Sequence, residues 1–488
     1  MLSLKNSSAN RNWSALPWVI FFLNLIIKII YLSNNSIGND EPFSIFHSQL
    51  SPAVIINELS TGNNPPLFEL ILHYWIGLMG TDAFSVRFLP CIFSSVTAVL
   101  ILQLVLRYRD AGIAVVVSLV YTFSTYHMQF AHEARTYSLF CMLAVWSYLF
   151  FSDHIHTLSG RKLLLWTIAN TLLIYTHYLG FLIPATQLLT MFLTGGFRKK
   201  NLIASGIMLT GMLVLYMPWI NILLARLQHT TSNGTWVKPA VAEDIYNSIW
   251  SFSNSPVVAM FFIIVLVSWL ILIIKHRVSA DRFTKTIALW FIFPLTLMFM
   301  FSWSALPINM PIFVDRYLIF FSPAFYILVT CAAAEMISVF KLSRVWLIIP
   351  CVAMAVSFNP NPDNKRHVAE AIQTIRQQET SNTLVLFAPA DFRFNFAYYY
   401  DRKIFASTAQ DPVYRKIDSL LSLQHVYGIN TKNDMNAHDI NSYQKIIYLD
   451  AGSSFMWNNN GITDSLNAVR TLNSSQQFRD IFTLYTFE

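Results

Sequence analysis

Long apolar runs alternate with short polar connections over about the first 358 residues of the chain. A membrane-spanning helix needs about 20 mostly apolar residues. On that criterion the sequence predicts about eleven spans, near 14–33, 88–106, 111–128, 136–151, 163–177, 179–195, 202–221, 256–274, 286–303, 317–339 and 344–358. The pattern therefore predicts an α-helical, multi-pass membrane protein.

One further apolar run, at about residues 65–80, is ambiguous. It is short, begins with two prolines and carries Glu69 and His73. We interpret it as an interfacial helix, which lies in the plane of the membrane surface, within the long first loop at 34–87. Counting it as a span would move every later loop to the opposite side of the membrane, so the loop charges test this interpretation.

The distribution of basic residues supports the interfacial interpretation. Cytoplasmic loops of membrane proteins carry an excess of Lys and Arg. Without a span at 65–80, one set of loops holds Arg107, Arg109, Arg161, Lys162, Arg198, Lys199, Lys200, Lys275, Arg277, Arg282, Lys285, Lys341 and Arg344. The opposite loops hold only Arg87, Arg135, Arg226, Lys238 and Arg316. This asymmetry predicts a cytoplasmic N-terminus and a C-terminus outside the cytoplasm.

The composition of the chain changes to polar near Asn359. A helix pattern follows at Val368, Ile372 and Ile375, and apolar strand-like runs lie at 384–387 and 446–449. We therefore predict a transmembrane domain over 1–358 and a soluble, extracytoplasmic α/β domain over 359–488.

Composition agrees with a membrane protein and excludes other classes. The chain is 55% hydrophobic and only 12% charged, against roughly 25% charged residues in a soluble domain. The net charge of +7 does not indicate a nucleic-acid binder, because Lys and Arg lie in short clusters between apolar runs. The four cysteines lie in or beside apolar runs without CxxC spacing, so we expect neither disulfides nor a zinc cluster.

Four polar features adjoin the predicted spans, and the topology places all of them on the non-cytoplasmic side. They are Asp40-Glu41, the segment 132–137 (HEARTY), His177-Tyr178, and Asp315-Arg316-Tyr317. Charged groups near a bilayer are costly unless they face water or each other, which makes these residues candidates for a functional site.

Each feature also has an ordinary structural explanation. Asp40-Glu41 fits a solvated turn, Arg135 and Arg316 fit side chains that extend to the membrane interface, and His177-Tyr178 fits an interfacial amphipathic pair. His127 and His132 do not share one helix face as the histidines of HExxH do, so a metal site is not favoured. We expect Lys28, within the first span, to extend outward toward the loop that holds Asp40.

One carboxylate with two arginines suits the transfer of a sugar from a lipid phosphate to a hydroxyl group. A glycosidase needs a second carboxyl group to protonate its leaving group, whereas phosphate leaves as a stable anion. One carboxylate then suffices as the base, and arginines bind the phosphate in bidentate fashion. A single displacement of this kind inverts the anomeric centre.

Two other classes of protein remain as alternatives. A transporter or flippase of a lipid-linked sugar also needs basic residues for the phosphate, but it should place polar groups along a path through the membrane. A receptor that senses a ligand through its outer domain would leave Asp40, Arg135 and Arg316 unexplained.

Several short motifs resemble those of the GT-C glycosyltransferases related to protein O-mannosyltransferases and to the lipid A aminoarabinose transferase. The resemblance covers about residues 14–340 and rests on GNDEPFS, NNPPLFELILHYW, HEARTYSL and VDRYLIF, in this order relative to the spans. It implies Asp40 as catalytic base with Glu41 beside it, and Arg135 and Arg316 as ligands of the donor phosphate. At one position the chain differs: the aminoarabinose transferases have a phosphate-binding lysine just before Pro-Pro, where this chain has Asn64.

These observations lead to a specific expectation. The chain is expected to be an inverting glycosyltransferase of GT-C type in the inner or plasma membrane, using a polyprenyl-phosphate-linked sugar as donor and a protein, lipid or glycan hydroxyl as acceptor. Glu133, Tyr137, His177 and Tyr178 are expected to line the site. The residues identify no cofactor and leave a divalent metal requirement open.

The topology can be tested by labelling with a membrane-impermeant thiol reagent. A cysteine introduced near Asn39 should react from outside the cytoplasm, and one near Lys199 only from the cytoplasmic side. Labelling of both positions from the same side would contradict the arrangement.

Overall fold

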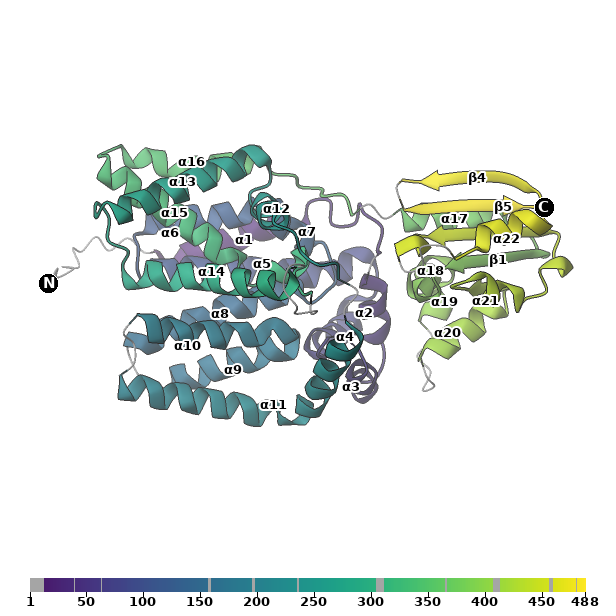
Figure 1. Ribbon diagram of the computed structural model, residues 1–488, viewed down its shortest axis with the longest axis horizontal. Coiled ribbons are helices and arrows are strands. Elements are labelled where there is room, and N and C mark those ends of the chain that lie inside the picture. Colours follow the sequence, from purple (N-terminus) through teal and green to yellow (C-terminus); the bar gives the residue numbers. More distant parts are fainter. Residues whose placement is uncertain are drawn as a thin grey trace.

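The structure is a computed structural model of the chain. It describes residues 13–488 except 39, 63, 157–158, 195–197, 235–236, 304–310, 365–366, 407–412, 456–459 and 480. The long helices lie side by side in one bundle, and a mixed sheet with its own helices lies beyond one end of that bundle (Figure 1). The sequence leaves a second long loop, 222–255, between the predicted spans 202–221 and 256–274, and Trp236 in this loop lies outside the described residues.

Every apolar run predicted from the sequence contains a helix of the bundle. These helices are α1 (Leu16–Ile29), α5 (Ala83–Leu106), α6 (Ala111–Thr122) with α7 (Thr125–Ala131), α8 (Tyr137–His156), α9 (Gly160–Thr176), α10 (Leu182–Leu193), α11 (Lys199–Asn233), α13 (Pro256–Ile274), α14 (Arg282–Ser302), α15 (Ser322–Val339) and α16 (Ile349–Val356). Among the described residues, five helices (α5, α11, α13, α14 and α15) are long and apolar enough to cross a membrane, and α6 with α7 adds a sixth if the pair counts as one span. The multi-pass helical class is confirmed, although several of the predicted spans correspond to shorter helices.

Aspartates begin several helices at the end of the bundle away from the sheet. Asp110 accepts hydrogen bonds from the first backbone amides of α6, and Asp281 accepts one from the backbone of Thr284 in α14. Such caps satisfy amides that have no partner within the helix. Arg109 pairs with Asp281 at 2.8 Å and Arg344 approaches Asp110 at 3.6 Å. Loops that the sequence analysis placed on one side of the membrane therefore meet at one end of the bundle.

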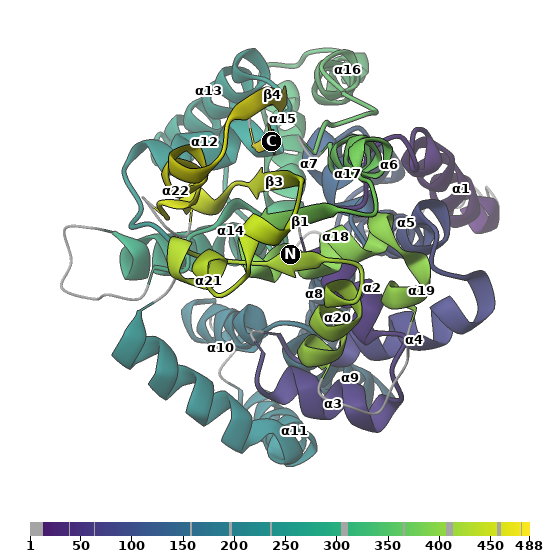
Figure 2. The same ribbon diagram turned by 90° about the vertical axis from the view of Figure 1, so that its right-hand side faces the viewer.

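Short helices cross the opposite end of the bundle. They are α2 (Glu41–His47), α3 (Pro52–Ser60) and α4 (Leu67–Met79), and Figure 2 shows α3 and α4 along their length while many bundle helices are seen end-on. Helix α4 covers most of the run 65–80, for which the sequence predicts an interfacial helix. It buries Phe68 and Leu72 and exposes Tyr74 and Leu78, which is the division expected of a helix at a membrane surface.

A break divides the third predicted span. Helix α6 ends at Thr122, α7 begins at Thr125, and the two are bent by 60°. Lys28 of α1 is buried beside this break and donates hydrogen bonds to the carbonyl oxygens of Thr122 and Ser124 at 3.1 and 3.4 Å. The expectation that Lys28 extends outward is therefore wrong, because the end of α6 offers carbonyl acceptors inside the bundle.

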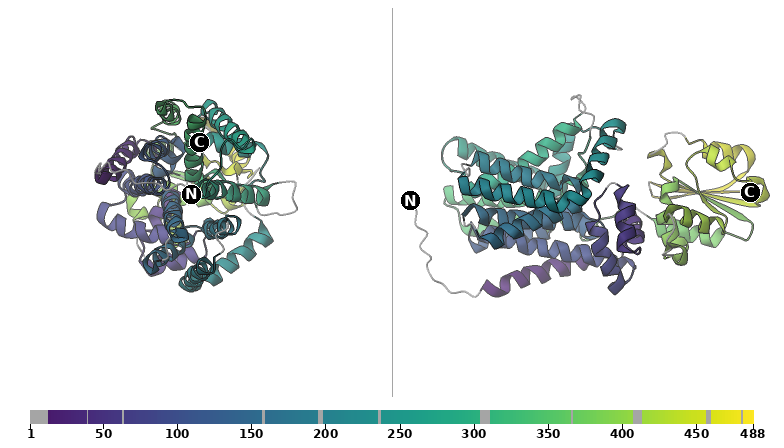
Figure 3. Two further views of the ribbon diagram at one scale, coloured as in Figure 1. Left: turned by 90° about the vertical axis from the view of Figure 1, so that its left-hand side faces the viewer. Right: turned by 90° about the horizontal axis from the view of Figure 1, so that it is seen from below.

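The C-terminal region is an α/β domain, as predicted. Its sheet has the order β2-β1-β3-β5-β4, in which β1 is parallel to β2 and β3, and β5 is antiparallel to β3 and β4. Helices lie on both sides of this sheet (Figure 3), so that every residue of β1 is buried, as is usual for a central parallel strand. The strands are β1 (Thr383–Ala388), β2 (Val426–Gly428), β3 (Lys445–Ala451), β4 (Leu472–Phe478) and β5 (Phe482–Phe487), and the helices are α17 (Val368–Gln378), α18 (Arg393–Tyr400), α19 (Arg402–Phe405), α20 (Val413–Ser422), α21 (Lys432–Asn436) and α22 (Ile462–Val469).

Helix α18 joins this domain to the first loop of the bundle. The hydroxyl oxygen of Tyr399 accepts a hydrogen bond from the Ile37 backbone amide at 2.6 Å. The Phe394 ring packs against Phe43 and Phe46 of α2, with centroids 5.7 and 5.2 Å apart. The C-terminal domain therefore contacts the segment that leads into α2.

A buried ion pair anchors the start of α2. Arg87 of α5 donates to both carboxylate oxygens of Glu41 at 2.8 and 2.7 Å, and to backbone carbonyls of residues 32, 35 and 36. Glu41 also accepts hydrogen bonds from the backbone amides of Gly38 and Ala134. Together, these contacts connect the first loop, α5 and the turn before α8.

We expect Glu41 and its neighbour Asp40 to differ sharply in their effect on stability. Glu41→Gln or Arg87→Met leaves one member of a buried pair without its counter-charge, which should cost about 3–5 kcal/mol. Asp40→Asn changes a half-exposed side chain and should cost less than about 0.5 kcal/mol. Thermal unfolding of the purified variants in one detergent measures the difference, and equal losses for Asp40→Asn and Glu41→Gln would contradict the assignment.

Candidate active site

Asp40 presents an accessible carboxylate at the start of α2. It occupies the N-cap position, where an aspartate usually accepts a hydrogen bond from the helix backbone, yet its side chain makes no such bond. The side chain is 47% exposed, and its Oδ2 lies 3.6 Å from Nη1 of Arg316. Asp40 is therefore available to a molecule outside the protein, in contrast to the buried Glu41.

Arg316 reaches Asp40 from a short 3₁₀ helix, η3 (Asp315–Leu318), which precedes α15. Its side chain is 28% exposed, and its guanidinium lies 5.7 Å from the ring centre of Tyr317. The hydroxyl of Tyr126 on α7 donates to the backbone carbonyl of Asp315 at 2.5 Å. The broken helix therefore supports the segment that carries Arg316.

Arg135 lies deeper, in the turn between α7 and α8. Its Nη1 donates to the Ser44 hydroxyl at 2.5 Å and lies 3.6 Å from Oε1 of Glu69. Ser44 in turn donates to Glu69 at 2.7 Å. The sequence analysis gave Glu69 no role in the site, although a carboxylate within an apolar run was a signal for one.

Glu133 lies next to the charged groups of the site and is affected by all of them. Burial, followed by repulsion from the carboxylates of Glu41 and Asp40, raises the pKa of Glu133 to about 7, while Arg135 and Arg316 oppose the rise. This carboxyl group therefore keeps its proton to a higher pH than an exposed glutamate does.

His177 follows the end of α9 and faces the same charges. Burial, with the positive charges of Arg316 and Arg135, lowers the pKa of His177 to about 3, so the ring is neutral at physiological pH. Its Nδ1 accepts a hydrogen bond from the Leu179 amide, and its ring packs 4.8 Å from Tyr317.

Most residues predicted for the site are brought together by the fold. Tyr137, the first residue of α8, interacts electrostatically with Arg316, Arg135, Glu133 and Asp40. Tyr178 instead contacts α11, where it accepts a hydrogen bond from Nε1 of Trp219 at 3.3 Å. The structure therefore groups Asp40, Glu133, Arg135, Tyr137, His177 and Arg316, and Glu41 is buried next to Asp40. Tyr178 lies against a different helix, α11.

The two histidines considered for a metal site make structural hydrogen bonds. His127 Nε2 lies 2.9 Å from the Ser322 hydroxyl, and His132 Nε2 lies 2.7 Å from the Lys28 carbonyl oxygen. Within the part of the chain that the structure describes, no group of three or more His, Cys, Asp or Glu side chains is arranged to hold a metal ion.

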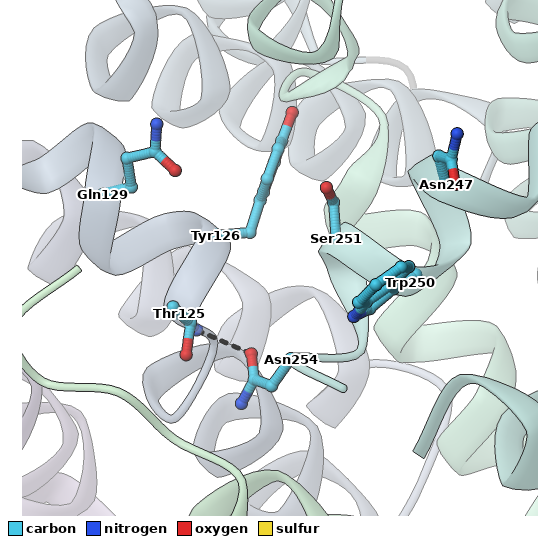
Figure 4. A pocket seen from close by; sticks show the side chains of 7 residues that line it. All are labelled: Thr125, Tyr126, Gln129, Asn247, Trp250, Ser251 and Asn254. Carbon is cyan, nitrogen blue, oxygen red and sulfur yellow. Dashed lines mark hydrogen bonds between the residues drawn. The ribbon is translucent and has the colours of Figure 1, made fainter. Parts of the chain in front are cut away.

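A cavity of about 400 Å³ (Figure 4) adjoins the segment that carries Arg316, because Tyr126 in its wall bonds to Asp315. It lies between α7 and α12 (Glu243–Phe252) and is lined by Thr125, Tyr126, Gln129, Asn247, Trp250, Ser251 and Asn254. Tyr126 belongs both to this cavity and to the support of Arg316. The sequence analysis did not find the cavity, because α12 falls in the loop 222–255, where no pattern linked it to α7.

The arrangement combines two capabilities at one end of the bundle. Asp40 can accept a proton from a molecule that reaches it, and the partly exposed guanidinium of Arg316 can meet an anion, while the buried Arg135 adds a second positive charge near Asp40. Neutral His177 adds no competing charge.

Comparisons with known proteins relate the chain to one fold and one family. Residues 63–222, about a third of the chain, match the family described as dolichyl-phosphate-mannose-protein mannosyltransferase. Comparison with curated protein sequences gave no match.

Solved structures are similar over nearly the whole length. ArnT from Cupriavidus metallidurans bound to undecaprenyl phosphate has a TM-score of 0.61 at 11% identity, with 98% of each chain covered. The apo state of the same protein has a TM-score of 0.60 at 12% identity, with 97% of this chain and 98% of that chain covered. The chain therefore has the GT-C fold, and its residues 63–222 are similar to the family described as dolichyl-phosphate-mannose-protein mannosyltransferase.

Proposed function

We propose that the protein is an inverting membrane glycosyltransferase that moves a sugar from a polyprenyl-phosphate-linked donor to an acceptor hydroxyl of a protein, lipid or glycan. The observation that carries the proposal is the pairing of an accessible Asp40 carboxylate with Arg316 at 3.6 Å, beside Arg135. The family description names a lipid-phosphate sugar and the ArnT structure holds undecaprenyl phosphate, which supports a donor of this class.

The reaction follows from the charges of the site. Asp40 takes the proton of the acceptor hydroxyl as its oxygen attacks the anomeric carbon. The bond from that carbon to the phosphate oxygen breaks, and its electron pair leaves with the phosphate. Arg316 and Arg135 stabilise the negative charge that develops there. Attack from the side opposite the phosphate inverts the anomeric centre.

The contact between Asp40 and Arg316 serves both steps. The two groups attract each other across 3.6 Å, which is longer than the usual limit of about 3.2 Å for a hydrogen bond. An incoming phosphate competes for the guanidinium, and the Asp40 carboxylate then becomes a stronger base because it loses part of its counter-charge.

Buried groups hold these reactive residues in place. Glu41, fixed by Arg87, sets the start of α2 and therefore the position of Asp40. Glu69 and Ser44 orient Arg135 through contacts of 3.6 and 2.5 Å. In this proposal Glu41 is a positioning residue, and Glu133, Tyr137 and His177 line the site, whereas Tyr178 does not.

We further propose that the site and the C-terminal domain lie on the extracytoplasmic side of the inner or plasma membrane. The support is the separation of charges: the loops of Arg109 and Arg344 meet at the end of the bundle opposite to α2, as the positive-inside rule requires of a cytoplasmic face. The exposed apolar face of α4 would then contact the outer leaflet and the lipid of the donor.

Asp40→Asn tests the proposed base. The purified variant in nanodiscs is offered radiolabelled polyprenyl-phosphate sugars with a membrane or cell-wall extract as acceptor. Loss of the base should reduce the rate of transfer by about 10²–10⁴-fold, while Asp464→Asn, an exposed aspartate on α22, keeps the parental rate. Transfer by Asp40→Asn as fast as by the parent protein would show that Asp40 is not the base, and transport of the lipid without transfer would favour a flippase.

Arg316→Gln tests the recognition of the phosphate. A lost charged hydrogen bond is worth about 1.5–3 kcal/mol, so the affinity for polyprenyl phosphate should fall by at least about tenfold. Arg277→Gln, at an exposed arginine following α13, is the matched control and should bind as the parent does. Binding is measured by microscale thermophoresis in nanodiscs, and equal affinities for parent and Arg316→Gln would remove Arg316 from the phosphate site.

A further inference from the structure

We propose that the cavity between α7 and α12 is a carbohydrate subsite, which binds a neutral sugar ring next to the reacting centre. The proposal rests on the proposed function and names the chemical class of ligand that the cavity accepts. The sugar comes either from the donor or from a glycan acceptor, and the kinetic arms of the test below distinguish these two sources.

The lining of the cavity carries no charged side chain. Its seven residues are two aromatics and five with hydroxyl or amide groups. A phosphate or carboxylate would lack a cation in this cavity, whereas a polyol requires only hydrogen bonds. Its volume of about 400 Å³ lies within the usual range of about 300–1,000 Å³ for small-molecule pockets.

Trp250 provides the flat apolar surface that a sugar ring needs. Its side chain is 42% exposed, and Figure 4 shows it on the α12 side of the cavity, across from Tyr126 and Gln129 of α7. The carbon-bound hydrogens of a sugar face are apolar and pack on an indole ring, as other apolar groups do. The ring hydroxyls would then point toward the polar residues around Trp250.

Gln129, Asn247 and Ser251 supply those polar groups. Gln129 and Asn247 are exposed, and each has an amide that both donates and accepts hydrogen bonds. Neighbouring sugar hydroxyls need this combination, because each hydroxyl is also both a donor and an acceptor. Ser251 adds a hydroxyl on the same wall as Trp250.

The two walls are held together by Asn254. Its Oδ1 accepts a hydrogen bond from the Thr125 amide at 2.7 Å, and its Nδ2 donates to the carbonyls of Phe123 and Met354 at 2.8 and 3.0 Å. Asn254 has a φ of 63°, in the left-handed region. Its side chain therefore joins the break between α6 and α7 to the end of α12, so the cavity is built into the fold.

The cavity communicates with the reacting centre through one residue. Tyr126 forms part of its wall, and the Tyr126 hydroxyl bonds to the carbonyl of Asp315, whose neighbour Arg316 pairs with Asp40. A sugar in the cavity would therefore lie beside the segment that presents the phosphate ligand.

Exposed tryptophans also anchor helices at membrane interfaces, and the test separates that role from sugar binding. The test variants are Trp250→Ala and Asn247→Ala, with Trp250→Phe as the conservative change. The matched control is Trp303→Ala, because Trp303 is as exposed as Trp250, follows the end of α14 and does not line the cavity. An anchoring role would make Trp250→Ala and Trp303→Ala similar.

The first arm measures binding without any reaction. Saturation-transfer NMR is recorded on the full-length protein in nanodiscs with glucose, mannose and galactose as probes. At least one sugar should bind to the parent and equally well to Trp303→Ala. It should bind at least about fivefold more weakly to Trp250→Ala and Asn247→Ala, and Trp250→Phe should restore binding. The proposal is overturned if none of the sugars binds to the parent protein, or if the sugars bind to Trp250→Ala as tightly as to the parent. Both results hold whether or not the protein transfers sugar.

The second arm uses the transfer assay to identify the source of the sugar. A raised KM for the acceptor in Trp250→Ala, with an unchanged KM for the donor, assigns the cavity to a glycan acceptor. A raised KM for the donor alone assigns it to the transferred sugar. A change in kcat with both KM values unchanged overturns the subsite. If no transfer is detected while the sugars still bind at Trp250, the proposed function fails and the subsite stands.

Discussion

The bidentate pair between Arg87 and Glu41 is the contact on which the geometry of the site depends. It connects α5 to the first loop, and the backbone amide of Ala134 bonds to the same carboxylate. Asp40 and Arg135 lie directly beside these two anchored positions, so one buried interaction sets both. Breaking such a pair leaves an uncompensated buried charge, and this cost keeps the positions of Asp40 and Arg135 fixed relative to each other.

Two adjacent carboxylates have opposite environments as a result. Glu41 has its oxygens occupied by guanidinium and amide donors, whereas Asp40 makes no helix-capping bond and faces solvent and Arg316. A chemical base must reach its substrate, and a positioning carboxylate must not be free to move. The Tyr399 contact to Ile37 extends this anchoring to the C-terminal domain, so that the soluble part of the chain helps to hold the loop that presents Asp40.

Much of the fold could be predicted from the sequence, because hydropathy and the distribution of charge act over long segments. Runs such as 256–274 are long and apolar enough to form a spanning helix wherever they lie in the chain. The break at Thr122 and the inward direction of Lys28 could not be predicted, because they depend on acceptors from a helix about ninety residues away in sequence. For the site, charged motifs pointed to Asp40, Arg135 and Arg316, and only the family resemblance distinguished Asp40 from Glu41, because the partner of Glu41, Arg87, lies on α5. The cavity at Trp250 is lined by uncharged residues, so no pattern of charges along the sequence pointed to it.

In the proposed mechanism, Arg135 and Arg316 bind the phosphate of a lipid donor next to Asp40. The most direct measurement is an experimental structure of the protein in nanodiscs with polyprenyl phosphate bound. We predict phosphate oxygens within about 2.7–3.2 Å of both guanidinium groups, with the lipid chain leaving along the bundle near α4. A phosphate bound at a position that neither arginine reaches would contradict the account.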